Sequence, residues 1–490
     1  MNTRPSLSVG ANNRDATFSG SIFGEAASIT KAGAGTWTLT GNNTFNAPFN
    51  ITGGAVAIDT DARLGNALST LTLDGGTLRT NAAIADLRAL AVGANGGTLD
   101  TQGFNVTQTG GLTGMGALTK LGSGTLTLAA VGTLSGDTRL AAGTLALGDD
   151  TALGTGTLQF DGGTLQATGG PRTLANAVSL NADTTVSGST ALTFAGPLTL
   201  TRNRDLTVAN TALTTISGSI GESGGPRSLN RYGAGELVLA GASTYTGGTL
   251  LAEGTTRISN STGSAFGTGA VTLASGATLT GAGLFSGALQ NNGTYAPGNS
   301  PTLATLSSFN QGSTGTLVLE IAGLARGTGY DALDITGVAT FGGTLEISFY
   351  NGFNVGGGES FDLFNWGGVS GAFATLNLPA LTAGLEWDTS ALYTTGVLGV
   401  SAIPEPSTCA AMSAATSPRR SARWLAPRPG LTAGLFSAPL ASRDRYPLPS
   451  HAIRQALGRD PRRLRHRPRL VALAWRRPGP TPGWQQPAPV

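Results

Sequence analysis

The chain of 490 residues contains 75 glycines, and only 12% of its residues are charged. Alanine, glycine, threonine and leucine dominate without a sustained 3.6-residue period, which argues against a helix-rich or mixed α/β protein. Residues 1–408 hold 15 Lys and Arg against 25 Asp and Glu, whereas residues 409–490 hold 15 Arg against 2 Asp. Both histidines and the one cysteine lie after residue 408. Because residues 1–408 contain no histidine or cysteine, this part of the chain cannot form a Ser-His-Asp or Cys-His catalytic site. It also cannot form a metal site built from His or thiolate ligands.

Residues 1–19 form a short amino-terminal segment. It contains Arg4 but no run of about 7 to 15 apolar residues, which a secretory signal peptide requires. We therefore expect the signal peptide to be missing from this segment.

A thirteen-residue phrase then occurs three times, as ITKAGAGTWTLTG from Ile29, LTKLGSGTLTLAA from Leu118 and LNRYGAGELVLAG from Leu229. Each copy places an apolar, a polar and a basic residue before Gly-small-Gly and a segment of period two. This pattern predicts a glycine turn that leads into a β-strand, and its repetition predicts a solenoid. The repeat glycines are Gly33, Gly35, Gly122, Gly124, Gly233 and Gly235.

A second phrase follows each copy, starting at Arg63, Ala152 and Ala265. Within these blocks, equivalent apolar residues recur at about the length of one coil of a parallel β-helix: Val56, Leu78 and Leu99 are 22 and 21 residues apart, and Leu145 and Leu165 are 20 apart. We therefore predict an all-β fold, with a right-handed parallel β-helix over residues 20–300.

The period of two within a strand also predicts which side chains enter the core. Leu71 and Leu73, and likewise Leu126 and Leu128, should point into the stack, because alternate side chains in a strand face opposite sides. The threonines between them should face outward.

Residues 301–402 form a second, β-rich module. Carboxylates are the remaining candidates for chemistry: Asp149 with Asp150, Asp331 with Asp334, and Glu359 with Asp362. Such pairs serve acid–base catalysis or calcium binding in some proteins, and parallel β-helices include polysaccharide lyases and hydrolases. The first pair is predicted in a turn and the second beside a short strand, where solvated carboxylates are ordinary. Trp366 and Trp387 are expected in the core of the module rather than on a ligand platform.

The module is followed by residues 403–408, where the chain reads Ile-Pro-Glu-Pro-Ser-Thr. This motif, Pro404, Glu405, Pro406, Ser407 and Thr408, resembles the PEP-CTERM sorting signal of exported bacterial proteins. The repeats upstream resemble the autotransporter-associated β-strand repeat, and the stretches from Gly293, Leu317, Tyr330 and Gly342 resemble the module that commonly precedes that signal. The resemblance covers about residues 20–408.

The resemblance implies an exported, non-enzymatic protein of the cell surface or extracellular matrix. It implies the sorting machinery of the cell envelope as a partner, a role beside exopolysaccharide or in biofilm, and no cofactor. Proline residues on both sides of Glu405 would keep the motif extended and readable.

The tail departs from that family. A membrane anchor needs about 17 to 25 apolar residues after the motif, but the chain reaches Pro418 and Arg419 within a dozen residues. We expect residues 409–490 to be a disordered, Arg- and Pro-rich segment that a frameshift has put in place of the anchor. The alternative is a basic segment that binds nucleic acid through arginine and stacked tryptophan, which the break at the sorting motif disfavours.

Two alternative functions stay open beside the structural surface protein. One is a β-helical polysaccharide lyase or hydrolase that uses a carboxylate pair. The other is a true autotransporter, which would require a carboxy-terminal membrane domain of alternating strands of about ten residues, and the sequence after residue 300 shows too few of them.

Overall fold

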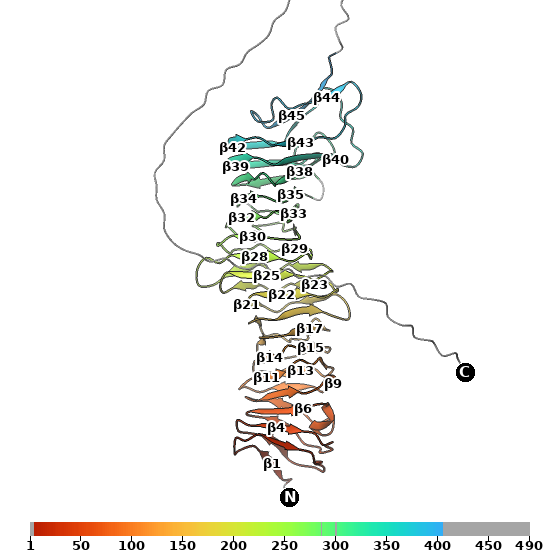
Figure 1. The fold of residues 1–490 in the computed structure, drawn as a ribbon, viewed down its shortest axis with the longest axis vertical. Helices are drawn as coiled ribbons and strands as arrows, with labels where there is room; N and C mark the ends of the chain where they lie inside the picture. The colour runs from red at the N-terminus through yellow and green to blue at the C-terminus, as the bar shows by residue number, and fades with distance from the viewer. Residues whose placement is uncertain (1–3, 286, 299–300, 405–490) are drawn as a thin grey trace, which may run out of the picture. The chain divides into compact units, whose positions relative to one another are not determined.

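The computed structural model describes residues 4–285, 287–298 and 301–404. In this part of the chain, each short strand pairs in parallel with the equivalent strand of the preceding coil, so that the coils form a stack. β1 and β42 lie near opposite ends of this stack (Figure 1). The one helical element described is the 3-10 helix η1, Asp61–Leu64. The predicted all-β parallel solenoid is confirmed.

Four parallel sheets run along the stack. The first sheet contains β1 (Ser6–Val9), β3 (Ser28–Lys31), β5 (Phe49–Ile51), β7 (Leu71–Leu73), β10 (Leu90–Val92) and β13 (Leu112–Gly114). The second contains β2 (Ala16–Phe18), β4 (Thr36–Leu39), β6 (Ala55–Ile58), β8 (Thr77–Thr80), β11 (Gly97–Asp100), β14 (Leu118–Leu121), β16 (Thr138–Leu140), β18 (Leu158–Phe160), β21 (Val178–Leu180), β24 (Leu198–Leu200) and β27 (Ile220–Glu222).

The third sheet is the longest. It contains β9 (Ile84–Leu87), β12 (Val106–Gln108), β15 (Thr125–Leu128), β17 (Thr144–Leu147), β19 (Thr164–Ala167), β22 (Thr184–Ser187), β25 (Arg204–Val208), β28 (Leu229–Tyr232), β30 (Thr249–Leu251), β32 (Val271–Leu273), β34 (Ala288–Asn291), β36 (Leu303–Leu306), β37 (Ser308–Gln311), β39 (Ala332–Phe341) and β42 (Phe364–Gly371).

The fourth sheet covers the later coils, and a small fifth sheet follows it. The fourth contains β20 (Arg172–Leu174), β23 (Leu192–Phe194), β26 (Thr214–Ile216), β29 (Leu237–Leu239), β31 (Thr255–Ile258), β33 (Thr278–Gly281), β35 (Thr294–Pro297), β38 (Thr316–Ile321), β40 (Thr344–Phe349) and β43 (Thr375–Asn377). The fifth is antiparallel and contains β41 (Ser360–Asp362), β44 (Leu385–Asp388) and β45 (Val397–Ala402).

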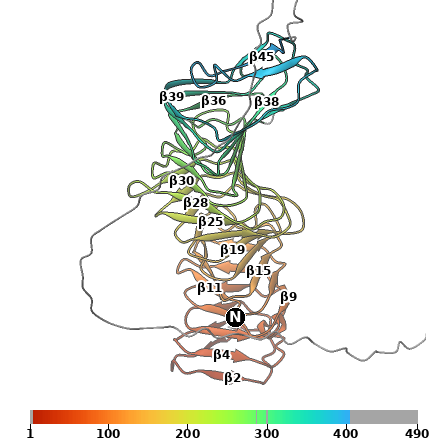
Figure 2. The same cartoon turned by 45° about the horizontal axis from the view of Figure 1, so that its top comes forward.

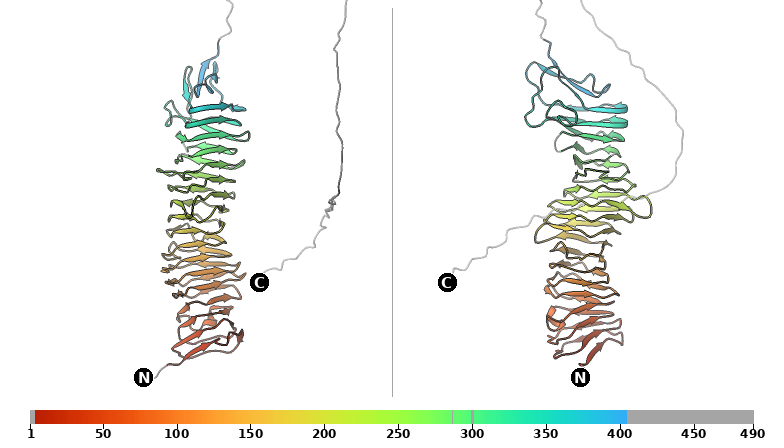
Figure 3. Two further views of the ribbon diagram at one scale, coloured as in Figure 1. Left: turned by 90° about the vertical axis from the view of Figure 1, so that its left-hand side faces the viewer. Right: turned by 180° about the vertical axis from the view of Figure 1, so that it is seen from behind.

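The strand register agrees with the coil length read from the sequence. Val56 pairs with Leu78, which pairs with Leu99, and Leu145 pairs with Leu165. Each coil therefore places an apolar side chain directly on the equivalent side chain of the next coil. The stack is visible from two further sides in Figure 3.

The core is one continuous column of these inward side chains. Leu71, Leu73, Leu126 and Leu128 are all buried, whereas the threonines between them are not. Because coils share the column, each one depends on its neighbours for burial, at about 1.5 to 3 kcal/mol per buried leucine. The prediction of inward leucines and outward threonines is confirmed.

Parallel pairing crosses residue 300, where the sequence analysis divides solenoid from module. β35 pairs with β38 and β38 with β40, so coils continue to β43. The antiparallel strands β41, β44 and β45 come after most of these coils (Figure 2). Trp366 and Trp387 both pack partly buried against the core, as expected.

Candidate functional surface

Each of the two repeat glycines in a copy meets a different structural requirement. Gly122 has φ +80, a left-handed conformation that side chains disfavour. Gly124 lies against the preceding coil, since a Cβ on it would be 1.9 Å from the carbonyl oxygen of Phe104. The same left-handed turn and close approach occur at Gly33 with Gly35 and at Gly233 with Gly235. The repeat glycines thus shape the turn and allow coils to stack.

The basic residue of each phrase lies inside the turn. Lys120 has no exposed surface, and its Nζ donates hydrogen bonds to the carbonyl oxygens of Leu121 (2.8 Å), Gly122 (2.8 Å) and Ala142 (3.1 Å). Ala142 belongs to the next coil. The ammonium group therefore ties the glycine turns of two successive coils together.

The other two copies use the same arrangement. Lys31 donates to the carbonyls of Ala32, Gly33 and Gly53, and Arg231 donates to those of Gly233, Gly235, Glu253 and Thr255. Both side chains are fully buried. In each case, the partners include a carbonyl of the coil that follows.

Burial lowers the pKa of all three cations. It lowers the pKa of Lys120 to about 8, although the charge of Asp100 opposes the change. It also lowers the pKa of Arg231 to about 10, with Glu253 opposing, and that of Lys31 below its ordinary value. The sequence analysis missed this buried position. The signal was present, because Lys120 is two residues after the inward Leu118 and so shares its face.

The three copies occupy successive corners of the solenoid. The first lies where the first sheet turns into the second, between β3 and β4. The second lies between β14 and β15, at the turn from the second sheet to the third, and the third lies between β28 and β29, at the turn from the third to the fourth. The buried cation thus advances by one face from each copy to the next.

The candidate carboxylate pairs are each engaged in local structure. Asp149 accepts hydrogen bonds from the backbone and hydroxyl of Thr151, which lower its pKa. Asp334 and Asp362 both form ion pairs with Arg326, at 2.7 and 3.2 Å. Glu359 accepts a hydrogen bond from the backbone N–H of Gly356. These contacts are those of turn and strand carboxylates, and no pair is joined to a built active site in the described residues.

Asp331 differs because it is buried. Its two oxygens accept the backbone N–H groups of Thr302 (2.7 Å) and Glu320 (2.8 Å). Burial raises its pKa to about 7; the two hydrogen bonds oppose the rise and the charge of Glu320 adds to it. The carboxyl group fastens three strands or strand ends to one another.

A stability measurement can test this carboxyl group. Its pKa is higher in the folded chain than in the unfolded chain, so its contribution is largest below pH 4 and is lost as pH rises to about 7. We expect β38 and β39 to gain about 2 kcal/mol of protection when pH falls from 7.5 to 5, and Asp331→Asn to abolish that gain. Hydrogen exchange corrected for the intrinsic pH dependence measures it. An equal gain in the variant would contradict the assignment.

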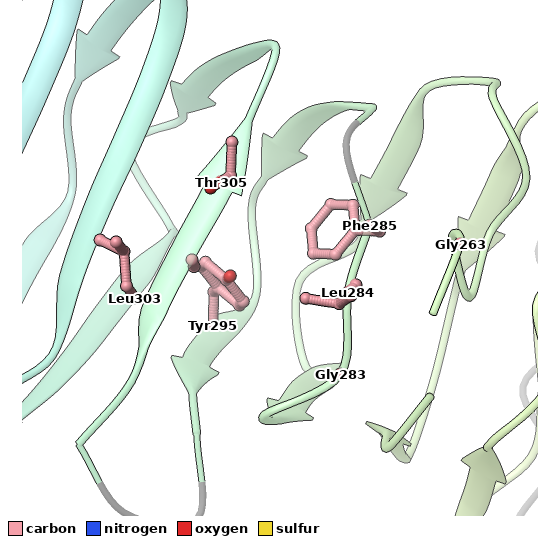
Figure 4. Close-up of a pocket in the computed structure, with 8 residues that line it drawn as sticks. Gly263, Gly283, Leu284, Phe285, Tyr295, Leu303 and Thr305 are labelled. Carbon is pink, nitrogen blue, oxygen red and sulfur yellow. The ribbon is translucent and has the colours of Figure 1, made fainter. Parts of the chain in front are cut away.

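A pocket of about 230 Å³ opens between late coils. Figure 4 shows Leu303 and Thr305 on β36, Leu284 and Phe285 on another coil, and Tyr295 between them. Burial raises the pKa of Tyr295 above its ordinary value, and Asp331 adds to the change. Its described lining residues provide an apolar wall and one phenol, and no two of them form a pair for acid–base chemistry.

The outer face of the fourth sheet carries a regular row of threonines. Six threonines of the fourth sheet pair in register along successive coils, each at the start of its strand. They lie about 4.8 Å apart, the spacing of neighbouring strands. Five of them are partly exposed, and Thr375 is exposed. The row comprises Thr255, Thr278, Thr294, Thr316, Thr344 and Thr375.

The sorting motif lies almost wholly outside the described residues. Pro404 is exposed two residues after β45, and Glu405, Pro406, Ser407 and Thr408 are not described, nor is the tail over 409–490. Among the residues that are described, no helix is long and apolar enough to cross a membrane. Within the same residues, no three His, Cys, Asp or Glu side chains group closely enough to hold a metal ion.

Three segments match the family described as Passenger-associated-transport-repeat, over residues 29–58, 118–147 and 229–258. They begin at the first residue of each thirteen-residue phrase. The chain is also 42% identical over 123 residues to the Adhesin BmaC autotransporter of Brucella suis biovar 1 (strain 1330), a match that covers 25% of this chain and 4% of that relative. The predicted autotransporter-associated repeats are thereby confirmed at these three segments, which lie within the parallel β-solenoid.

Proposed function

We propose that this chain is a non-enzymatic adhesive protein of the cell surface or extracellular matrix, and that its outer hydroxyl rows contact hydrated exopolysaccharide. The observation that carries the proposal is the in-register row of six threonines from Thr255 to Thr375. Hydroxyl groups exchange hydrogen bonds with water and sugar at little net change in free energy, so many weak contacts along a rigid row add up. Similarity to an adhesin supports the same role.

Charge narrows the class of polysaccharide. Residues 1–408 carry ten more acidic than basic side chains. An acidic polymer would be repelled at low ionic strength, whereas a neutral one would not. The preferred partner is therefore a neutral glycan.

The binding test uses the chain truncated after residue 408, so that the 15 arginines of the tail do not bind the acidic beads. The beads are an insoluble neutral β-glucan, with alginate as the acidic comparison. We expect retention on the glucan and little on alginate. Thr294→Val with Thr316→Val should weaken retention about tenfold, because valine keeps the shape but removes the hydroxyl. The matched double change to serine keeps the hydroxyls and should bind normally. Equal retention of the valine and serine variants would exclude this row as the contact surface.

Export is the second part of the proposal, and it rests on the Pro-Glu-Pro-Ser-Thr motif from Pro404 to Thr408. We infer that an envelope sorting machinery reads this segment, which proline keeps extended. Changing Pro404 and Pro406 to Ala should leave the solenoid folded and abolish processing in cells that express the chain with an export signal and an anchor. Immunoblotting of surface fractions measures processing. Normal cleavage of the double variant would reject the motif as a sorting signal.

A further inference from the structure

The coil from Thr278 to Thr294 is short. Thr278 pairs in register with Thr294, sixteen positions later, whereas the coils before and after it advance 23 and 22 positions between their equivalent threonines. The coil that follows has room for an extra strand, β36, before β37. In the short coil, no described residue between β33 and β34 belongs to a strand. β36 therefore pairs with β39 on one side and with no described strand on the other.

The backbone of β36 presents an open edge toward the short coil. The N–H of Ala332 on β39 donates to the carbonyl oxygen of Thr302 (2.9 Å), so Thr302 and every second residue after it face β39. The N–H and C=O groups of Leu303 and Thr305 consequently point the other way. No hydrogen bond between described residues uses any of these four groups.

The pocket of about 230 Å³ lies along this open edge. Leu303 and Thr305 form one side of it, Leu284 and Phe285 of the short coil form the other, and Tyr295 lies between them (Figure 4). Leu284 is 46% exposed and Leu303 is 41% exposed. None of the described lining residues is charged. The opening is thus apolar, with unpaired peptide groups along one wall.

Both walls are fastened on the sides that face away from the opening. The N–H of Leu284 donates to Asn260 Oδ1 (3.0 Å), and its carbonyl oxygen accepts the N–H of Ala265 (2.8 Å). Both partners belong to the coil before. On the other wall, the N–H of Thr302 donates to the buried carboxylate of Asp331 (2.7 Å). These contacts hold the opening in place, so little order has to be gained when it is filled.

The chemistry of the edge indicates the kind of ligand. Edge strands are generally protected by a charged residue, a proline or a bulge, but β36 reads Leu-Ala-Thr-Leu and carries neither charge nor proline. Its unpaired N–H and C=O groups alternate at the repeat of a strand. Another extended polypeptide offers the complementary groups at the same repeat, whereas a sugar ring does not.

We propose that an extended, uncharged segment of a partner protein adds a strand to β36 and places one apolar side chain in the pocket. The added strand takes the position that β34 of the preceding coil takes beside β37, so it continues a pairing that runs along the whole third sheet. The pocket is smaller than the sites of drug-sized molecules, which suits a single side chain. The contact is small, and binding is therefore weak and reversible. The proposal does not depend on polysaccharide binding or on sorting.

Fluorescence polarisation with a labelled peptide tests the proposal on the full chain. The probe carries Thr-Leu-Thr-Leu, the sequence of β15, between Gly-Ser ends. We expect saturable binding. A peptide with the same side chains and N-methylated backbone nitrogens should bind at least tenfold more weakly, because it lacks the donors that pair with the edge. A soluble neutral β-glucan oligosaccharide should not compete. Absence of saturable binding, equal binding of the N-methylated peptide or competition by the glucan would overturn the proposal.

A matched pair of variants tests the edge itself. Thr305→Pro removes an N–H that faces the opening, whereas Thr305→Val keeps it. Because proline is tolerated on an unpaired strand edge, both variants should unfold at the same urea concentration as the unchanged chain. We expect Thr305→Pro to weaken peptide binding about tenfold or more and Thr305→Val to leave it unchanged. Equal binding by the two variants would refute β36 as the docking edge.

Hydrogen exchange locates the bound peptide. At saturation, amides of residues 302–306 should exchange more slowly, since the N–H groups of Leu303 and Thr305 gain acceptors. Amides of β44 and β45 should exchange as before. Binding that leaves the exchange of residues 302–306 unchanged would place the peptide elsewhere and reject the proposal.

Discussion

Replacement of Gly124 by Ala should open the solenoid at one coil. A Cβ on this residue would lie 1.9, 2.6 and 2.7 Å from the O, C and N atoms of Phe104. All three are backbone atoms of the preceding coil, so no side chain can rotate to relieve the overlap. The coils must separate, which strains the hydrogen bond from the Gly124 N–H to the Gln102 carbonyl (2.8 Å). We expect a loss of about 3 kcal/mol or more.

Hydrogen exchange followed by mass spectrometry localises this effect, because a solenoid can open at one place while distant coils stay folded. Peptides of β12 and β15 should lose protection first. Gly103→Ala is the matched control, one coil earlier, since its Cβ would meet only Ser123 Oγ at 3.8 Å. If both variants exchange alike, close coil approach is not the reason for glycine at this position.

Much of this fold could be predicted from the sequence because its constraints are local and repeated. The spacing of Val56, Leu78 and Leu99 equals the length of a coil, and the same residues pair in register. The period of two then assigns each side chain to a face. The start of each repeat could also be predicted, since glycine occurs at the same positions in all three copies of the phrase.

Other features could not be predicted because they depend on contacts between distant residues. Arg88 and Asp61 form an ion pair although they are 27 residues apart, and no periodic pattern marks either of them. The continuation of coils beyond residue 300 was hidden because β38, β39 and β40 are longer than the earlier strands and connect through longer loops. The threonine row depends on register across six coils, which a single phrase does not determine.

The recurrence of the basic residue is visible in the sequence, but the reason for its burial is visible only in the structure. The basic residue recurs at the third position of each phrase, yet basic residues usually face water. Only the carbonyl groups of two stacked turns make an inward position favourable for it. Those carbonyls converge because the left-handed glycine turns them inward. The glycine and the cation thus act together. The glycine forms the turn, and the cation donates hydrogen bonds to the carbonyl oxygens of the turn.

Lys120→Met should therefore destabilise the coil pair around β14 and β16. Methionine fills a similar volume but donates no hydrogen bond, so the carbonyls of Leu121, Gly122 and Ala142 lose the charged donor that they share. Removing the buried ammonium relieves its desolvation, which offsets part of the loss. We expect a net loss of about 2 to 3 kcal/mol.

The control for this change is Thr119→Met, which introduces the same side chain one residue earlier on the outer face, between Thr98 and Arg139. It should alter stability by less than about 0.5 kcal/mol. Urea unfolding monitored by hydrogen exchange of the β14 and β16 peptides compares the two variants. Lys120→Arg should retain most of the stability, because Arg231 fills the equivalent position in the third copy. If Lys120→Met unfolds at the same urea concentration as Thr119→Met, the cation is not what joins successive turns, and stacking rests on the glycine turn and the apolar column alone.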